Sequence, residues 1–261
     1  MFAFLNSNQS CYMDTVLVCM FVPTDSFDFM LDHPQNKVAG LLAREVSKLG
    51  NIAKQRSPWV ITELREALGD PWDTNSQQSA VDFFHALLDM CGMPDIGAQT
   101  QLTTHILRDD SKPPEVESVD DTFRVHTVIA GFHEHLTDAF KHVEHIDHPT
   151  SKYKTIISVI RPQQAPTLVF EVGRNASRRL IKYGEFDPSD NDRCTLVVGN
   201  DKYTLAGVAC RRGVHYVGFV WMEGWYYYND LNGEFVLLRG TPEEQHTPPT
   251  RYGELFFYYL V

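Results

Sequence analysis

The sequence predicts an α+β fold, with a mainly helical first third followed by a remainder rich in strands. Apolar residues recur at helical spacing in residues 11–22, 35–50, 62–68 and 75–89. Further along the chain the pattern changes to short β-branched and apolar runs at 155–160, 167–172, 195–198 and 203–208. The last residues, 255–261, form another apolar run of strand type.

Length, composition and charge limit the classes of protein to consider. At 261 residues with 43% hydrophobic side chains, the chain has room for one large or two small globular domains. No apolar run reaches membrane-spanning length, and residues 1–5 lack the basic region of a signal peptide. A formal charge of −11 argues against a nucleic-acid partner, because phosphate contacts need clustered Lys and Arg. We therefore expect no nucleic-acid partner and no membrane.

The five cysteines are scattered and form neither a disulfide framework nor a C-x-x-C pair. This favours a reducing, intracellular setting, cytoplasmic or nuclear. Apart from one histidine-rich segment considered below, we expect no metal and no other cofactor.

A candidate nucleophile stands where the first apolar-periodic run begins. Cys11 follows Asn8 and Ser10, which are good helix-capping residues, so it is expected in the first turn of a helix. The free N–H groups and partial positive charge of a helix N-terminus favour a thiolate over a thiol. The alternative is a buried free cysteine that acts as a small hydrophobe.

A base and its orienting partner are predicted far downstream. The runs 203–208, 214–220 and 225–230 indicate strands, the second beginning near His215 and the third ending at Asn229 and Asp230. Neighbouring antiparallel strands bring such positions side by side, and a nucleophilic cysteine needs this kind of pair. Alternatively, His215 is a core histidine and Asn229-Asp230 belongs only to a turn.

These stretches together resemble the ubiquitin-specific protease family of papain-like deubiquitinating cysteine peptidases. The family's first box, N-x-G-N-T-C-Y-M-N-S, is similar to residues 6–15, and its last boxes, Y-x-L-x-A-V, G-H-Y and W-Y-x-F-N/D-D, are similar to 203–208, 214–216 and 225–230. A middle box, Q-Q-D-A-x-E-F, is similar to 77–83, and the strand at 166–174 and the closing strand also match. The likeness runs from residue 5 nearly to the end and is weakest over 95–160.

The resemblance implies a role for each matching residue. Cys11 is the nucleophile, His215 the general base and acid, and Asn229 the residue that fixes the imidazole tautomer, with Asp230 as the other candidate for that role or as a helper. Asn6, five residues before the cysteine, matches the position of the oxyanion-hole side chain. Asn6 alternatively shapes only a turn.

The same resemblance implies a set of substrate-binding residues: Gln78 and Asp82 along the cleft, Val214 before the base, and Tyr216 and Trp225 among the aromatic residues. Most of the aromatics are expected in the core, with a few lining a narrow channel for a Gly-Gly tail. Val214 replaces the glycine of the family's pattern, which predicts a narrower channel or a changed backbone there.

A single catalytic domain, 1–261, is implied, with a helical thumb (1–95), a reduced fingers region (96–160) and a β-rich palm (161–261). The fingers region lacks the family's paired C-x-x-C zinc knuckles, so this is expected to be a compact, zinc-free member. Residues 109–121 are expected to form a loop and 133–145 a helix. Several histidines between His133 and His148 form either a solvated polar face or a metal site, since a helix would put His142 and His145 on one side.

The implied activity is thiol-dependent hydrolysis of the bond after the C-terminal glycine of ubiquitin, by a monomer whose partners are ubiquitin and its conjugates. Its acidic charge would attract the basic tail and contact face of such a substrate. The alternatives are a peptidase for another ubiquitin-like modifier, a catalytically inactive ubiquitin-binding module, or an acyltransferase of Cys-His-Asp type.

Overall fold

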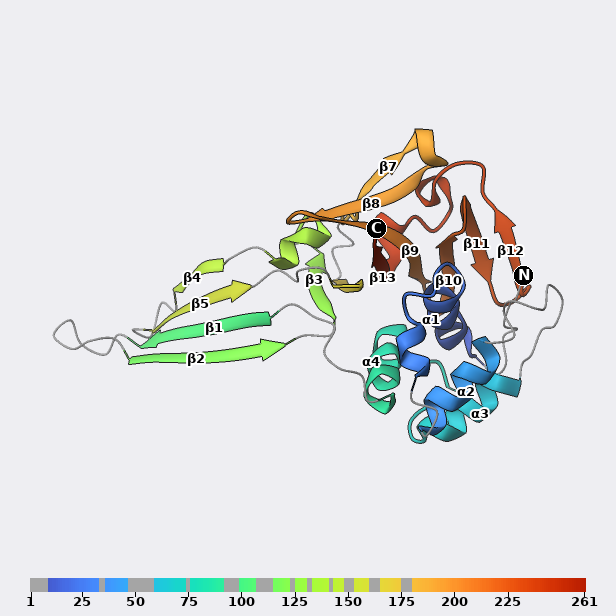
Figure 1. The fold of residues 1–261 in the computed structure, drawn as a ribbon, viewed down its shortest axis with the longest axis horizontal. Coiled ribbons are helices and arrows are strands. Elements are labelled where there is room, and N and C mark those ends of the chain that lie inside the picture. The colour runs from blue at the N-terminus through green and yellow to red at the C-terminus, as the bar shows by residue number, and fades with distance from the viewer. Residues whose placement is uncertain are drawn as a thin grey trace.

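The computed structural model describes most of the 261 residues. The described ranges are 9–32, 36–46, 59–73, 76–91, 99–106, 115–122, 125–130, 133–140, 143–147, 153–159, 165–174 and 180–261. Helices gather in one part of the molecule, beside a large sheet, and a smaller sheet extends away from both (Figure 1).

The first part of the chain forms helices. They are α1 (Cys11–Phe21), α2 (Lys37–Val46), α3 (Trp59–Leu68) and α4 (Ala80–Met90), with a 3-10 helix at Asp28–Leu31. The predicted helix at 62–68 is confirmed, and Gly69 ends it in a left-handed conformation, with φ of 72°. Ser79 caps α4, because its hydroxyl accepts the N–H of Asp82. The predicted end of the second helix at Gly50 lies outside the described residues.

The large sheet has the strand order β12-β11-β10-β9-β13-β6-β3, and β8 joins it through β9 and carries β7. Its pairs are antiparallel except for β3 with β6. The strands are β3 (His126–Ala130), β6 (Thr167–Arg174), β7 (Glu185–Asp187), β8 (Arg193–Val198), β9 (Asp201–Arg212), β10 (His215–Trp221), β11 (Trp225–Asn229), β12 (Glu234–Leu237) and β13 (Gly253–Leu260), with a short helix α5 (Pro249–Tyr252) before the last. The predicted strands over 167–172, 195–198 and 203–208 are confirmed.

Two cores lie on the two faces of this sheet. Along β10, Tyr216 and Val220 pack with the helices, whereas Val217, Phe219 and Trp221 pack in the other core. This alternation is the period of two that a strand imposes on its side chains. The sheet therefore carries α1 on one face and an aromatic-rich core on the other.

Every residue of α1 is buried, including the polar Asp14 and Thr15. Glycines allow its close approach to the sheet. A Cβ placed on Gly207 would lie 2.8 Å from the Cβ and 2.9 Å from the Cα of Cys19, on α1. The position of α1, and of the cysteine at its start, is therefore set by contact with the backbone of β9.

The smaller sheet corrects one prediction from the sequence. Its order is β2-β1-β5-β4, with β1 at Gln99–Ile106, β2 at Glu115–Thr122, β4 at Val143–Asp147 and β5 at Tyr153–Val159. Residues 115–121 were expected in a loop, yet they pair with β1 in continuous antiparallel register. Their acidic composition indicated a loop, but pairing uses backbone groups, which any side chain other than proline leaves free.

The predicted helix over 133–145 is also wrong. The segment contains a bridge from His135 to Lys182, a 3-10 helix at Leu136–Phe140 and then β4. The carboxylate of Asp138 accepts the N–H groups of Glu134 and His135, which stabilises a turn in place of a helix start. His145 therefore lies in a strand and not in a helix, while His142 lies outside the described residues.

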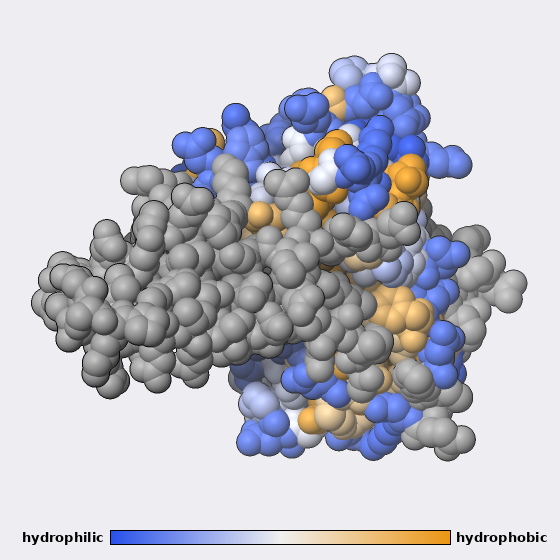
Figure 2. All heavy atoms as spheres, turned by 60° about the vertical axis from the view of Figure 1, so that its left-hand side comes forward, coloured by the Kyte–Doolittle hydropathy of each residue, from blue (hydrophilic) through white to orange (hydrophobic). Residues whose placement is uncertain are grey.

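The described surface on the face in Figure 2 is mostly hydrophilic, with hydrophobic residues gathered between its upper and lower parts. Of the helices that the structure describes, none is long and apolar enough to cross a membrane. The division into thumb, fingers and palm stays a prediction.

Candidate active site

Cys11 is the first residue of α1 and is 2% exposed. Ser10 precedes it at the N-cap, and its carbonyl accepts the N–H groups of Met13 and Asp14. The hydroxyl of Ser10 makes no cap and instead donates to the carboxyl group of Asp14, at 2.5 Å. The prediction that Cys11 lies in the first turn of a helix is confirmed, while Asn8 lies outside the described residues.

The β10–β11 hairpin brings the predicted base beside its partner. His215 begins β10 and Asn229 ends β11, and the two strands pair antiparallel, with Gly218 opposite Tyr228. The Nε2 of His215 lies 3.0 Å from the Oδ1 of Asn229. The N–H of Leu231 also donates to this Oδ1, at 3.1 Å, which fixes the amide with its oxygen toward the imidazole. Nε2 therefore carries the proton, and Nδ1 is left for the thiol.

Asp230 is fully buried, and its Oδ1 lies 3.7 Å from the same Nε2. The shorter distance makes Asn229 the direct partner of His215. Asp230 adds a negative charge nearby.

The electrostatics of His215 connect it to Cys11. A hydrogen bond with Cys11 is the largest cause that raises the pKa of His215 above its usual value. Burial opposes this, while the hydrogen bond to Asn229 and the charges of Cys11 and Asp230 raise the pKa further. The site therefore favours an imidazolium, the protonation state that a thiolate–imidazolium pair requires.

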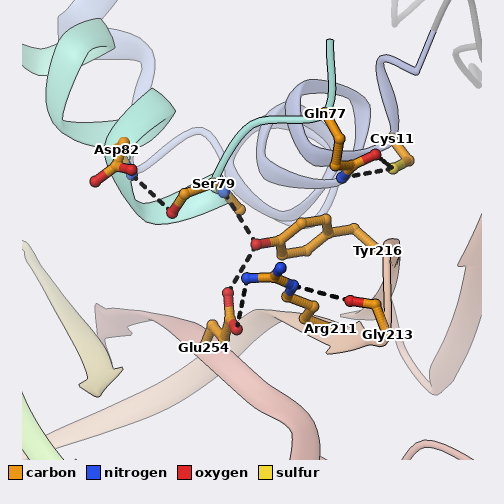
Figure 3. Close-up of polar contacts among 9 residues, drawn as sticks. Cys11, Gln77, Ser79, Asp82, Arg211, Gly213, Tyr216 and Glu254 are labelled. Carbon is orange, nitrogen blue, oxygen red and sulfur yellow. Dashed lines mark hydrogen bonds and ion pairs between the residues drawn. The ribbon is translucent and has the colours of Figure 1, made fainter. Parts of the chain in front are cut away.

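Gln77 is a site residue that the sequence reasoning missed. Its Nε2 lies 3.5 Å and its Oε1 3.7 Å from the Sγ of Cys11, and Figure 3 shows the amide facing the sulfur. The resemblance to the family pointed to Gln78, the second of two adjacent glutamines. The sequence feature that could have identified Gln77 is its place as the first residue of the Q-Q-D-A-x-E-F box over residues 77–83.

Tyr216 joins the segment before α4 to the sheet (Figure 3). Its hydroxyl accepts the N–H of Ala80 at 3.2 Å and donates to the carboxylate of Glu254 at 2.8 Å. Arg211 lies 3.9 Å from Glu254 and donates to the carbonyl of Gly213 in the turn before β10. Since His215 precedes Tyr216 and Gln77 precedes Ala80, this network fixes the two segments that flank Cys11.

The structure places the other predicted site residues as follows. Gln78 donates to the Ser76 hydroxyl, Asp82 is exposed near the start of α4, and Val214 is 75% exposed in the turn before His215. Trp225 belongs to a different core from Cys11. It is 1% exposed in the core on the other face of the sheet, where its Nε1 donates to the carbonyl of Asp192.

Asn6 lies outside the described residues, so its place at an oxyanion hole stays a prediction. Within the described ranges, no group of three or more His, Cys, Asp or Glu side chains is arranged to bind a metal ion. The side chain of His85, on α4, is 44% exposed and pairs with Glu171 at 2.8 Å.

Fold and site together define the class of structure. The chain is a mixed helix and antiparallel-sheet protein whose fold is that of the papain-like ubiquitin-specific proteases. In it, a cysteine at a helix start contacts a histidine that an asparagine orients.

The structural comparison finds proteins with this fold. The chain is similar to one in the SAGA DUB module of Ubp8, Sgf11, Sus1 and Sgf73 bound to monoubiquitin, with a TM-score of 0.68 and 14% identity, covering 100% of this chain and 69% of that one. For the same module bound to ubiquitin aldehyde, the TM-score is 0.68 and the identity 14%, covering 100% of this chain and 70% of that one. For a further structure of the module, the TM-score is 0.67 and the identity 16%, covering 100% of this chain and 68% of that one. No protein-family model and no curated protein matches the chain by sequence.

Proposed function

We propose that this chain is a thiol-dependent deubiquitinase that hydrolyses the peptide or isopeptide bond after the C-terminal glycine of ubiquitin by a Cys-His-Asn mechanism. The observation that carries the proposal is the His215 imidazole held by Asn229 at 3.0 Å, with Cys11 at the start of the buried helix α1. The interaction of Cys11 with His215 that raises the pKa of the histidine agrees with it. The match of the fold to Ubp8, in structures described as bound to ubiquitin, supports the choice of substrate.

In the first step, Nδ1 of His215 accepts the proton of Cys11 and the thiolate attacks the scissile carbonyl carbon. The resulting tetrahedral adduct collapses as the imidazolium returns its proton to the leaving amine, which leaves a thioester. Water then attacks the thioester with His215 as the base, and the thiol departs. Asn229 keeps the proton on Nε2 throughout, which leaves Nδ1 to exchange with the thiol.

The developing oxyanion would accept hydrogen bonds from the backbone N–H of Cys11 and from the side chain of Asn6. Gln77 contacts the sulfur itself, and an amide N–H directed at a thiolate stabilises its negative charge. The free enzyme would thus have a stabilised nucleophile before substrate arrives.

Gln78, Asp82 and Val214 are proposed to contact the substrate. Their support is their exposure or partial exposure on the segments that flank Cys11 and His215. The net charge of −11 favours a substrate with a basic tail. We also propose a reducing, intracellular location, which the five free cysteines support.

The test uses ubiquitin with a thiol-reactive electrophile at its C-terminus, with the covalent adduct measured by intact mass. The matched control is Cys91→Ala, because burial raises the pKa of Cys91 to about 11 and keeps it a thiol at neutral pH. We expect a single adduct in the wild type and in the control, and none in Cys11→Ala.

An adduct with a probe for another ubiquitin-like modifier, but none with ubiquitin, would keep the mechanism and replace the substrate. A folded protein that binds ubiquitin yet forms no adduct with any probe would be a binding module, and the enzymatic proposal would be wrong.

A further inference from the structure

The carboxylate of Glu254, near the start of β13, contacts residues of two neighbouring strands (Figure 3). Its Oε2 accepts the hydroxyl of Tyr216 on β10 at 2.8 Å, and that hydroxyl accepts the N–H of Ala80, the first residue of α4, at 3.2 Å. Its Oε1 lies 3.9 Å from Nη1 of Arg211 on β9. One side chain therefore connects the start of α4 with the end of the β9 strand.

Arg211 extends this contact to the turn between β9 and β10. Its Nε donates to the carbonyl of Gly213 at 3.0 Å. The turn has only two residues, Gly213 and Val214, because Arg212 pairs with His215 across it. Since a trans peptide places its C=O and N–H on opposite sides, a hydrogen bond that holds the Gly213 carbonyl also fixes the direction of the Val214 N–H.

Side-chain packing does not fix this turn. Val214 is 75% exposed, and a Cβ placed on Gly213 would have no atom beyond its chain neighbours within 4 Å. Gly213 has a φ of 67°, so glycine is needed there for its backbone conformation and not for space. In the part of the chain that the structure describes, the hydrogen bond from Arg211 is thus the side-chain contact that orients the central peptide of the turn.

The pair of Arg211 and Glu254 contributes little to global stability. Their side chains are 43% and 18% exposed, and the paired atoms lie 3.9 Å apart. Ion pairs of this partly solvated kind add little to the free energy of unfolding. The effect of the pair is therefore local, on a turn that directly precedes His215 and carries Val214, a proposed substrate contact.

We propose that Arg211 is a positioning residue: anchored by Glu254, it holds the two-residue turn before His215 in one orientation for the substrate tail to bind. The inference rests on the proposed function, because that function supplies the tail. Arginine suits the role, since its planar guanidinium donates through Nε and Nη1 in two fixed directions, whereas lysine has a single nitrogen.

The first experiment measures hydrolysis of ubiquitin that carries a C-terminal aminomethylcoumarin. It compares the wild type with Arg211→Gln and Glu254→Gln, and the matched control is Arg212→Gln, which removes the same charge from the adjacent exposed residue. We expect R211Q and E254Q to raise KM about five- to tenfold, because the substrate must then order the turn on binding. The control should have the KM of the wild type.

Three further readings separate positioning from other roles. The double variant R211Q/E254Q should raise KM no more than R211Q alone, because both changes remove one shared contact. Arg211→Lys keeps the charge without the two donors, and should behave like R211Q. Alkylation of Cys11 by iodoacetamide, which needs no bound tail, should be equal in all variants. An unchanged KM in R211Q, additive effects in the double variant, a lysine variant equal to the wild type, or slower alkylation in R211Q would each overturn the proposal.

A second measurement requires no substrate and uses R211Q, whose replaced side chain is half exposed, so it applies even if E254Q does not fold. It is the 15N relaxation of the Gly213 and Val214 amides, for which a rigid backbone gives an order parameter of about 0.85 and a flexible one less than about 0.6. We expect a rigid turn in the wild type and in R212Q, and a flexible turn in R211Q. Equal order parameters in all three would mean that backbone pairing alone holds the turn, and the proposal would be wrong.

The two measurements also separate this proposal from the deubiquitinase proposal. If the wild type does not hydrolyse the ubiquitin substrate but the turn becomes flexible in R211Q, Arg211 keeps its positioning role and the ubiquitin assignment is wrong. If the wild type hydrolyses the substrate and R211Q equals it in KM and in relaxation, the deubiquitinase proposal stands without Arg211. A flexible turn with an unchanged KM would show that the turn does not bind the tail, which would also overturn the inference.

Discussion

Replacing Gly207 by alanine should displace α1 and reduce both stability and the reactivity of Cys11. The new Cβ would lie 2.8–2.9 Å from the Cβ, Cα and carbonyl oxygen of Cys19, two of which are helix backbone. Since carbon atoms pack at about 3.5–4.0 Å, the helix must retreat by roughly 0.6–1.2 Å. Overpacking of this kind costs about 1–3 kcal/mol in the free energy of unfolding.

The matched control is Gly218→Ala on the neighbouring strand. Its Cβ would lie 3.4 Å from the Cys19 sulfur and 3.4 Å from a Thr15 methyl group, which is ordinary contact. Urea unfolding should therefore show G218A within about 1 kcal/mol of the wild type and G207A well below it.

The rate of Cys11 alkylation at pH 7 gives a second reading of the same displacement. Because α1 carries Cys11 and β10 carries His215, a shift of about 1 Å between helix and sheet separates nucleophile from base, and such misplacement costs up to about a hundredfold in rate. Equal stability and equal alkylation in G207A and G218A would refute the contact between α1 and β9 as the determinant of the site.

Three further substitutions test other contacts. Tyr216→Phe should lower the free energy of unfolding by about 1–3 kcal/mol in urea, because a buried N–H and Glu254 both lose a partner. Gln77→Ala should slow Cys11 alkylation roughly fivefold, the equivalent of about 1 kcal/mol for one hydrogen bond, without changing urea stability. The hydrogen bond to Glu171 is the largest cause that raises the pKa of His85, so the stability from this pair is fully present below pH 6.5 and is lost as pH rises through the raised pKa. At pH 6, Glu171→Gln should lower the free energy of unfolding by less than about 1 kcal/mol, because both side chains are partly solvated. Above the raised pKa of His85 the same substitution should not change that free energy. An equal loss of stability at both pH values would contradict the pairing.

The predictions that were confirmed depend on local signals. A polar residue before a periodic apolar run located the start of α1 at Cys11, although the Ser10 hydroxyl makes no cap there. Two apolar runs around a turn located the hairpin that pairs His215 with Asn229. Both signals lie within about fifteen residues of the chain, and over that range the repeat of a helix or a strand is visible in the order of apolar and polar residues.

The errors arose where tertiary pairing opposed local composition. Residues 115–121 are polar enough for a loop, but β1 offered a partner for their backbone groups along their whole length. Residues 133–145 have helical spacing, but the Asp138 carboxylate and pairing with β5 provided other partners for the backbone. In both segments the backbone found hydrogen bonds that the side-chain pattern does not encode.

The sequence by itself determined the α+β fold, the helix that begins at Cys11 and the hairpin that holds the histidine and asparagine. Only the tertiary structure decided that Gln77, 66 residues from Cys11, faces its sulfur, and that Trp225 is buried in the other core. The physical reason is that α1 packs on the sheet across glycines, and that one contact sets which distant side chains meet and which lose their solvent.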